Sequence, residues 1–161
     1  MRFFVAPLAI AAACLSAVGA SPSVIASRDV DLGTWLFGSI LTFFPNHTGW
    51  DAGYEATFAP TLKATFNQNK YDYKTLKELY TGIHTQMTTK YTGFAVNITS
   101  AVIVPNANDL GGLITLTGDE GGVPTSGGGL ITAPDSAFGV VSEINGRRWI
   151  TEWRETTDFV L

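Results

Sequence analysis

The sequence predicts a single α+β domain in which three helices of the N-terminal half pack into the concave side of a curved, mostly antiparallel sheet. Three observations support this fold class. Apolar residues follow helical spacing in the first half of the chain, alternating spacing replaces it after Gly93, and the chain closes on an Asn145-Gly146 turn. Helices and strands that are grouped along the chain, rather than interleaved, are typical of α+β proteins.

Residues 1–20 have the pattern of a secretory signal peptide. One positive residue, Arg2, precedes an apolar run, and the small residues Val18 and Ala20 occupy the positions that a signal peptidase reads. A membrane anchor is the alternative, but the run ends in a cleavage pattern. We therefore expect cleavage near Ala20, a secreted product without a membrane span, a flexible lead over 21–27 and one domain over 28–161.

The composition of the chain argues against certain kinds of chemistry and of binding partner. The single cysteine, Cys14, lies in the predicted signal peptide, so the mature chain is expected to have neither a disulfide nor thiol chemistry. Lys and Arg number 10 against 14 Asp and Glu, with no basic run. That balance argues against nucleic acid or an anionic membrane as a partner. Asn46 and Asn97 begin Asn-X-Thr sequons and are the predicted glycosylation sites.

Three helices are expected before Gly93. The first spans Arg28–Phe44, with Trp35 and Phe43 beside a predicted apolar face of Leu32, Leu36, Phe37, Ile40, Leu41 and Phe44. Pro45 ends it, and a second short helix follows over Trp50–Phe58. The third begins after an N-cap at Asp72 and places five residues on one face, namely Leu76, Leu79, Tyr80, Ile83 and Met87. Two short strands, Leu62–Phe66 and Lys70–Tyr73, precede it.

The second half of the chain reads as strands. Phe94–Val104 alternates, and the predicted inward residues are Phe94, Val96, Ile98, Val102 and Val104. Further strands are expected over Gly111–Thr117 and from Leu130 into the final hairpin. An Asn-Gly turn predicts the hairpin pairs Ile144/Arg147, Glu143/Arg148, Ser142/Trp149, Val141/Ile150, Val140/Thr151 and Phe138/Trp153. Its predicted core face carries Phe138, Val140, Ile144, Trp149 and Trp153, and the opposite face carries Glu143, Arg148, Glu152 and Arg154.

The order of elements and two segments resemble a known superfamily. The segments are FAPTLKATFNQNKYDYKTLKELY and EINGRRWITEW, and the likeness spans Arg28–Glu155. They are similar to the nuclear transport factor 2-like superfamily, which includes SnoaL-like polyketide cyclases, scytalone dehydratase and ketosteroid isomerase. The resemblance implies a cystatin-like cone that holds a small, mostly apolar ligand, and dimerisation through the open sheet face. No catalytic constellation of that superfamily transfers residue by residue to this chain.

Candidate catalytic residues come from the predicted helices, and the final hairpin is expected to supply none. His84 borders the apolar face of the third helix and is a candidate acid or base, with a helix-flank histidine as the structural alternative. Asp51 and Tyr54 lie one turn apart, which suits enolisation or dehydration; the alternative is a helix cap beside a packed tyrosine. Trp35, Tyr80 and Trp153 are the candidate ligand-pocket residues, although such aromatics are often simply core.

Neither a cofactor nor a metal site is predicted, because His47 and His84 lie far apart without further ligands nearby. Three hypotheses for function remain. The first is a secreted, glycosylated domain that binds a small apolar ligand in the cone. The second is a cofactor-free dehydratase, cyclase or isomerase that acts on a polyketide- or terpenoid-like substrate. The third is a non-catalytic surface interaction protein in which the cone is merely filled core. The charged face of the hairpin is the place where a partner chain is expected.

Overall fold

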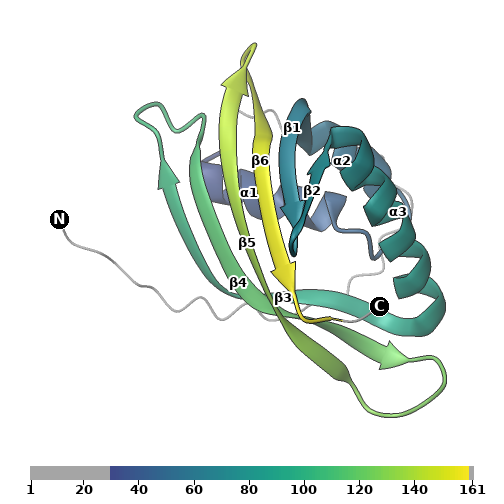
Figure 1. Ribbon diagram of the computed structural model, residues 1–161. Coiled ribbons are helices and arrows are strands. Elements are labelled where there is room, and N and C mark those ends of the chain that lie inside the picture. The colour runs from purple at the N-terminus through teal and green to yellow at the C-terminus, as the bar shows by residue number, and fades with distance from the viewer. Residues whose placement is uncertain (1–29, 160–161) are drawn as a thin grey trace.

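A computed structural model describes residues 30–159, so the predicted signal peptide and lead lie outside the described residues. The helices are α1 (Leu32–Phe43), α2 (Trp50–Thr57) and α3 (Tyr73–Lys90). The strands are β1 (Phe58–Phe66), β2 (Asn69–Asp72), β3 (Tyr91–Pro105), β4 (Gly112–Pro124), β5 (Ile131–Ile144) and β6 (Arg147–Thr157). They form one sheet in the order β2-β1-β6-β5-β4-β3, antiparallel except where β1 meets β6. The helices lie against one face of this curved sheet (Figure 1), which confirms the predicted α+β class.

Helix α1 begins at Leu32 because the Asp31 side chain caps it, accepting from the Thr34 N–H at 2.9 Å. The predicted start at Arg28 was therefore too early. The predicted apolar face of α1 was also wrong, since Leu41 is 75% exposed whereas Trp35 and Phe43 are buried. Apolar residues occur nearly all round this helix, so the hydrophobic period alone did not define which side faces the sheet.

Helix α3 agrees with its prediction. Asp72 and Thr75 form a capping box at its start. Four of the five residues on its predicted face are buried, namely Leu76, Tyr80, Ile83 and Met87, while Leu79 is partly buried. Strand β1 starts earlier than predicted, at Phe58, and it includes Pro60. The β1–β6 register is irregular between Phe58 and Lys63, which is where a strand tolerates a proline.

The β5–β6 hairpin confirms the Asn145-Gly146 turn, since both residues have positive φ angles, 55° and 76°. The four predicted pairs nearest the turn are also confirmed. The two further pairs were wrong because β6 contains one extra residue: Val141 pairs with Ile150, but Val140 pairs with Glu152. This β-bulge at Thr151 reverses which side chains face inward along the rest of β6.

The predicted hairpin faces were inverted along β5 and, on β6, between the turn and the bulge. On the turn side of it, Ile150 is buried and Ile144 is 41% exposed, the reverse of the predicted order. Arg148, predicted on the charged outer face, is 1% exposed. Beyond the bulge, Trp153 is buried as predicted, although by the reversed alternation. The inward residues beyond it therefore include Trp153 and Glu155.

A second bulge reverses β3 in the same way. Ile98 pairs with Gly118 and Ser100 with Thr117, which leaves Thr99 as the extra residue. Before it, the predicted inward residues Phe94, Val96 and Ile98 are buried or partly buried. After it, Val102 and Val104 face outward and are 59% and 54% exposed, so that part of the prediction was wrong. A two-residue period cannot reveal an inserted residue, because each half of the strand alternates correctly.

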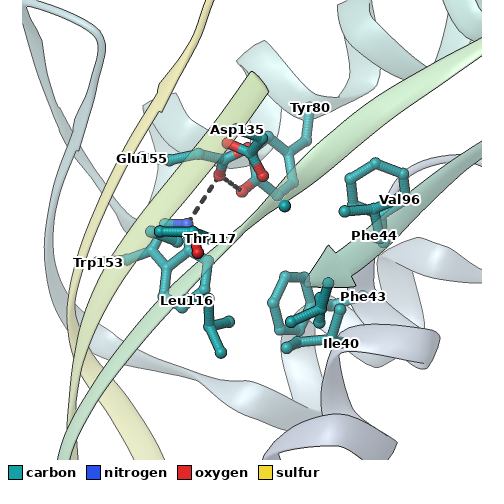
Figure 2. A pocket seen from close by; sticks show the side chains of 13 residues that line it. Ile40, Phe43, Phe44, Tyr80, Val96, Leu116, Thr117, Asp135, Trp153 and Glu155 are labelled. Carbon is teal, nitrogen blue, oxygen red and sulfur yellow. Dashed lines mark hydrogen bonds between the residues drawn. The ribbon is translucent and has the colours of Figure 1, made fainter. Parts of the chain in front are cut away.

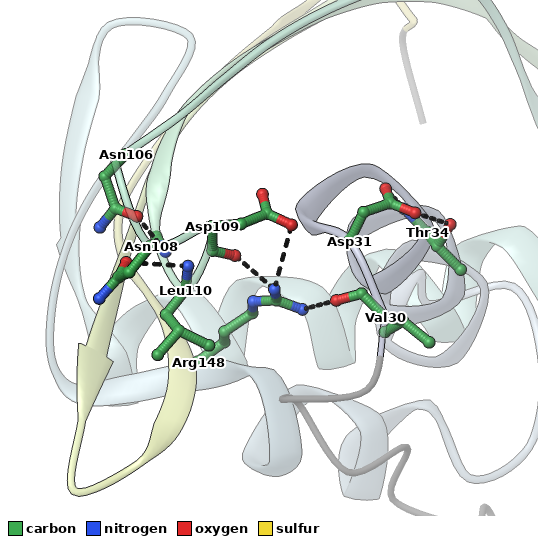
Figure 3. A network of polar contacts seen from close by, with 9 residues as sticks. Val30, Asp31, Thr34, Asn106, Asn108, Asp109, Leu110 and Arg148 are labelled. Atoms are coloured by element: carbon green, nitrogen blue, oxygen red, sulfur yellow. Dashed lines mark hydrogen bonds and ion pairs between the residues drawn. The ribbon is translucent and has the colours of Figure 1, made fainter.

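Arg148 lies in a buried polar network that joins distant segments (Figure 3). Its guanidinium donates to the Val30 carbonyl at 2.8 Å and to the Asp109 carbonyl, and it lies 3.9 Å from the Asp109 carboxylate. Val30 precedes α1, and Asp109 belongs to the β3–β4 loop, so one side chain holds both against β6. Its Nε has no partner among the described residues, which makes the guanidinium costly to bury.

We expect Arg148→Ala to lower the free energy of unfolding by about 3 kcal/mol, because two buried carbonyls lose their donor and the side chain leaves a void. Arg154→Ala on the same strand is the control. Its guanidinium is exposed in an ion pair with Glu152 at 3.6 Å. The Arg154→Ala substitution should therefore lower the free energy of unfolding by less than about 1 kcal/mol. Urea unfolding followed by tryptophan fluorescence measures both, and equal losses would contradict the assigned role of Arg148.

Candidate functional site

A small cavity lies between the helices and the concave side of the sheet (Figure 2). Its volume is about 30 Å³, which is room for on the order of two water molecules. Most of the lining is apolar, and the lining residues are Ile40, Phe43, Phe44, Tyr80, Val96, Ile98, Leu116, Thr117, Gly118, Asp135, Ala137, Trp153 and Glu155. Two carboxyl groups, those of Asp135 and Glu155, are the ionisable acids of this lining.

Glu155 is held at the cavity by two hydrogen bonds. The Tyr80 hydroxyl donates to its Oε2 at 2.6 Å, and the Trp153 indole N–H donates to the same oxygen at 2.8 Å. Tyr80 comes from the buried face of α3, and Trp153 precedes Glu155 by two residues on β6, so both side chains lie on the inward face. Burial raises the pKa of Glu155, and these two hydrogen bonds only partly oppose that effect.

Two further acids lie near Glu155. Burial raises the pKa of Asp135 to about 8, and the charges of Glu155 and Glu120 add to this rise. Burial also raises the pKa of Glu120 to about 7, although a hydrogen bond from the Thr157 hydroxyl opposes it. Asp135 Oδ1 is buried and has no hydrogen-bond partner among the described residues. Asp135 therefore has an unsatisfied polar atom and a pKa close to neutral, which suits a group that exchanges protons or receives a ligand.

Glu120 and Glu155 also line a smaller cavity of about 10 Å³, next to the first. Tyr80, Phe44 and Glu155 line both spaces. Within residues 30–159, no group of three or more His, Cys, Asp or Glu side chains has an arrangement able to hold a metal ion. Carboxyl and phenol groups at this site can exchange protons and form hydrogen bonds.

Of the candidate pocket residues, Tyr80 and Trp153 line the cavity. Trp35 is buried in the core but does not line the cavity; its ring lies 6.0 Å from the Arg148 guanidinium. Tyr80 and Trp153 contribute more than apolar walls, because each donates a hydrogen bond to Glu155. The structure therefore brings two of the three predicted pocket residues together.

The three catalytic candidates do not meet at the cavity. His84 is partly buried on α3, where its Nδ1 lies 2.9 Å from the Pro45 carbonyl. Asp51 is exposed, whereas Tyr54 is fully buried and donates to the Tyr73 carbonyl at 2.8 Å. Burial also raises the pKa of the Tyr54 hydroxyl. Asp51 and Tyr54 therefore lie in different surroundings, and neither lines the cavity.

The two sequons differ in their surroundings. Asn97 is exposed on the outward side of β3, as the sequon prediction requires. Asn46 is partly buried, and its side-chain amide donates to the Phe94 carbonyl at 2.9 Å. A glycan on Asn46 would replace one of the two hydrogens of this amide nitrogen, which now donates to the Phe94 carbonyl. Asn97 is thus the more accessible of the two acceptor sites.

Sequence reasoning missed all three acids of the site and placed the chemistry on the helices. Glu155 has the same parity as Trp153, which was expected to face inward, but alternation alone does not mark an inward acid as part of a site. Glu120 lies within the glycine-rich stretch 118–129, which looks like a loop. Its first part, up to Pro124, belongs to β4 and pairs with β5, where Asp135 lies opposite Gly118. The available signal was weak: Trp153-x-Glu155 places an acid at strand spacing from an aromatic residue that was correctly expected to face inward.

Comparison with known proteins supports the fold. No family model and no curated protein matches the sequence significantly. Solved structures do match, and one is a protein from Jannaschia sp. CCS1, described provisionally as a SnoaL-like polyketide cyclase. It shares 14% identity over 87% of this chain and 92% of that chain, with a TM-score of 0.53.

Two further structures show the same likeness. A nuclear transport factor 2-like superfamily protein from Salmonella enterica serovar Typhimurium has 11% identity over 77% of this chain and 89% of that chain, with a TM-score of 0.58. A protein from Novosphingobium aromaticivorans, described provisionally as a scytalone dehydratase, has 11% identity over 80% and 83%, with a TM-score of 0.55. The chain therefore has the nuclear transport factor 2-like fold, and the predicted resemblance is confirmed at the level of fold. No helix within residues 30–159 is long and apolar enough to span a membrane.

The buried acids predict a stability that falls as pH rises. Glu120 and Asp135 have folded pKa values near 7 and 8, above their ordinary values of 4.5 and 3.8. Between these limits the folded state binds more protons than the unfolded state, so the free energy of unfolding decreases with increasing pH. We expect a loss on the order of 2–5 kcal/mol between pH 5 and pH 8.

Thermal unfolding across this pH range measures the effect. Asp135→Asn removes one of the titrating groups, so it should flatten the decline and unfold at a higher temperature than the native protein at pH 8. Asp119→Asn is the matched control, because Asp119 is an exposed acid on β4, next to Glu120, and should follow the native curve. A melting temperature that stays level or rises from pH 5 to pH 8 would rule out the buried, protonated acids.

Proposed function

We propose that this chain is a secreted, N-glycosylated domain that binds a small molecule in its cone, with the polar end of the ligand at Asp135. The observation that carries the proposal is the buried, unpartnered Asp135 Oδ1 at the edge of a mostly apolar cavity. A buried polar atom without a partner costs on the order of 1–3 kcal/mol, and a ligand that hydrogen-bonds to it recovers this free energy.

The size of the cavity sets how a ligand enters. A volume of about 30 Å³ holds only the end of a molecule, so a longer ligand requires lining side chains to move. The side chains expected to move are those of Ile40 and Phe44, because they lie at the C-terminal end of α1 next to the Pro45 turn. The hydrogen bonds from Tyr80 and Trp153 keep Glu155 in place.

A second candidate is a cofactor-free lyase or isomerase of the dehydratase or cyclase type, with a polyketide- or terpenoid-like substrate. The specific observation is the pKa of Asp135 near 8, beside the Tyr80–Glu155 pair. A carboxyl group with a pKa near neutral can both give and take a proton at physiological pH. Two neighbours in fold are described provisionally as a polyketide cyclase and a scytalone dehydratase. The acid–base group would then be Asp135, in place of His84 or Asp51.

Filling the cavity tests ligand binding. Ala137 is buried in the lining, so Ala137→Leu should occlude the cavity and abolish retention of a co-purified small molecule. Ala133→Leu on the same strand is the control, because Ala133 does not belong to the lining. Ligands are identified by mass spectrometry of extracts from protein purified from its natural source. Equal retention by the native and Ala137→Leu proteins, or none by the native protein, would refute binding in the cone.

The same preparations separate binding from catalysis. Incubation of the native protein with candidate polyketide and terpenoid substrates should leave them unchanged if the chain only binds. Turnover that is lost in Asp135→Asn and kept in Asp119→Asn would instead establish the lyase or isomerase function. Circular dichroism of each variant verifies that loss of ligand or turnover does not reflect unfolding.

We also propose that the outer face of the sheet pairs two copies of the chain. Val102, Val104 and Leu113 are exposed there, and Val104 and Leu113 are direct neighbours across β3 and β4. The exposed Glu152–Arg154 pair gives this face charges of both signs, so a two-fold interface can match acid to base. Val104→Glu should convert a dimer to a monomer in light scattering, whereas Val123→Glu, an exposed valine at the other end of β4, should not. A monomeric native protein would refute this pairing.

A further inference from the structure

We infer that the ligand of the cone carries a positively charged amine, and that its ammonium group binds at Asp135 and Glu155 among aromatic rings. This inference rests on the proposed binding function and names the chemical class of the ligand. It depends on three features of the cavity: the sign of its charges, the unpartnered oxygen of Asp135, and the rings of its walls.

The charges around the cavity have one sign. Asp135 from β5 and Glu155 from β6 line it, and Glu120 from β4 lies in the adjoining space. The remaining titratable group is the Tyr80 hydroxyl from α3, and the side chains that α1 and β3 contribute are apolar. Among residues 30–159, no lysine, arginine or histidine belongs to the lining. An anionic ligand would therefore find no counter-charge here, whereas a cation would supply the one that the ionised acids lack.

The geometry leaves one carboxyl group free to receive that cation. Both donors near Glu155, the Tyr80 hydroxyl and the Trp153 indole, are already directed at Glu155 Oε2. Asp135 Oδ1 has no donor among the described residues. Figure 2 shows the Asp135 and Glu155 carboxyl groups close together, beside Tyr80. An ammonium group has three N–H donors and no acceptor, so it fits an arrangement of acceptors alone.

The walls favour an organic cation. The rings of Phe43, Phe44, Tyr80 and Trp153 line the cavity, and aromatic faces attract a desolvated cation. Metal ions are a poorer fit, since no set of acidic side chains in residues 30–159 has the arrangement to coordinate one. A cavity of about 30 Å³ admits an ammonium head, and a short aliphatic chain enters once the lining side chains move. We therefore expect a small aliphatic amine to be the minimal ligand.

Binding of a cation also changes the protonation of the site. Buried acids without a counter-ion hold their protons, and burial together with mutual repulsion raises the pKa of Asp135. A bound ammonium group favours the ionised carboxylate, so binding should release protons near neutral pH. Affinity should consequently rise from pH 5 to pH 8. It should fall again when the amine itself loses its proton near pH 10.

Three probes of one shape test the charge directly: isobutylamine, isobutanol and isobutyrate. Titration of the full secreted chain at pH 7.5, followed by the NMR signal of the Trp153 indole N–H, measures each affinity at the cavity. We expect the amine to bind about tenfold or more tightly than the alcohol, and the carboxylate not to bind. A pH-stat measurement in unbuffered solution should record proton release with the amine alone.

Substitutions test whether Asp135 is the residue that binds the ammonium group. Asp135→Asn should weaken isobutylamine binding by about tenfold or more and leave isobutanol binding nearly unchanged, while Asp119→Asn should alter neither. Because Asp135→Asn is expected to fold at least as well at pH 8, its loss of binding is not a loss of fold. Isobutanol binding as tightly as isobutylamine, or an unchanged amine affinity in Asp135→Asn, would overturn the inference and leave the binding function intact. Failure of all three probes, with no ligand retained by the native protein, would overturn both.

Discussion

The extra residue Thr151 in β6 decides what faces the inside of the cone. Side chains of a strand alternate between the two faces of a sheet, so one inserted residue exchanges the faces for everything beyond it. Near the turn, β6 presents Arg148 and Ile150 inward; beyond Thr151 it presents Trp153 and Glu155. Without the bulge, Glu152 and Arg154 would point at the helices. Thr99 does the same on β3 and sends Val102 and Val104 to the outer face.

Two buried polar groups of opposite character result from this arrangement. Arg148 is satisfied mainly by backbone carbonyls and holds the entry to α1 and the β3–β4 loop against β6. Glu155 is satisfied by Tyr80 and Trp153, but its neighbours Asp135 and Glu120 are also acids, and no Lys, Arg or His of residues 30–159 lines either cavity. The first arrangement has the features of a structural support. The second is destabilising in an empty cone above neutral pH, which is expected where a fold maintains a site at the expense of stability.

The position of this site within the fold matters for function. Proteins with the nuclear transport factor 2-like fold share a cone of helices on a curved sheet, and the fold alone does not specify an activity. In this chain the ionisable groups project from the sheet, on β4, β5 and β6, and the helices supply Tyr80 and apolar walls. Strands and helices are more rigid supports than loops for groups that must meet a ligand at fixed distances.

The sequence by itself determined the order of elements, the Asn145-Gly146 turn and its first four pairs, the Asp72 cap and the buried face of α3. These depend on local spacing and turn chemistry, which a sequence displays directly. It also pointed to Tyr80 and Trp153 as pocket residues. It did not predict Asp135, Glu155 and Glu120 as a cluster, nor the burial of Arg148 or the exposure of Leu41. Those features were decided by two inserted strand residues and by contacts between distant segments. Such effects belong to the tertiary structure, because local periodicity is identical on both sides of a bulge.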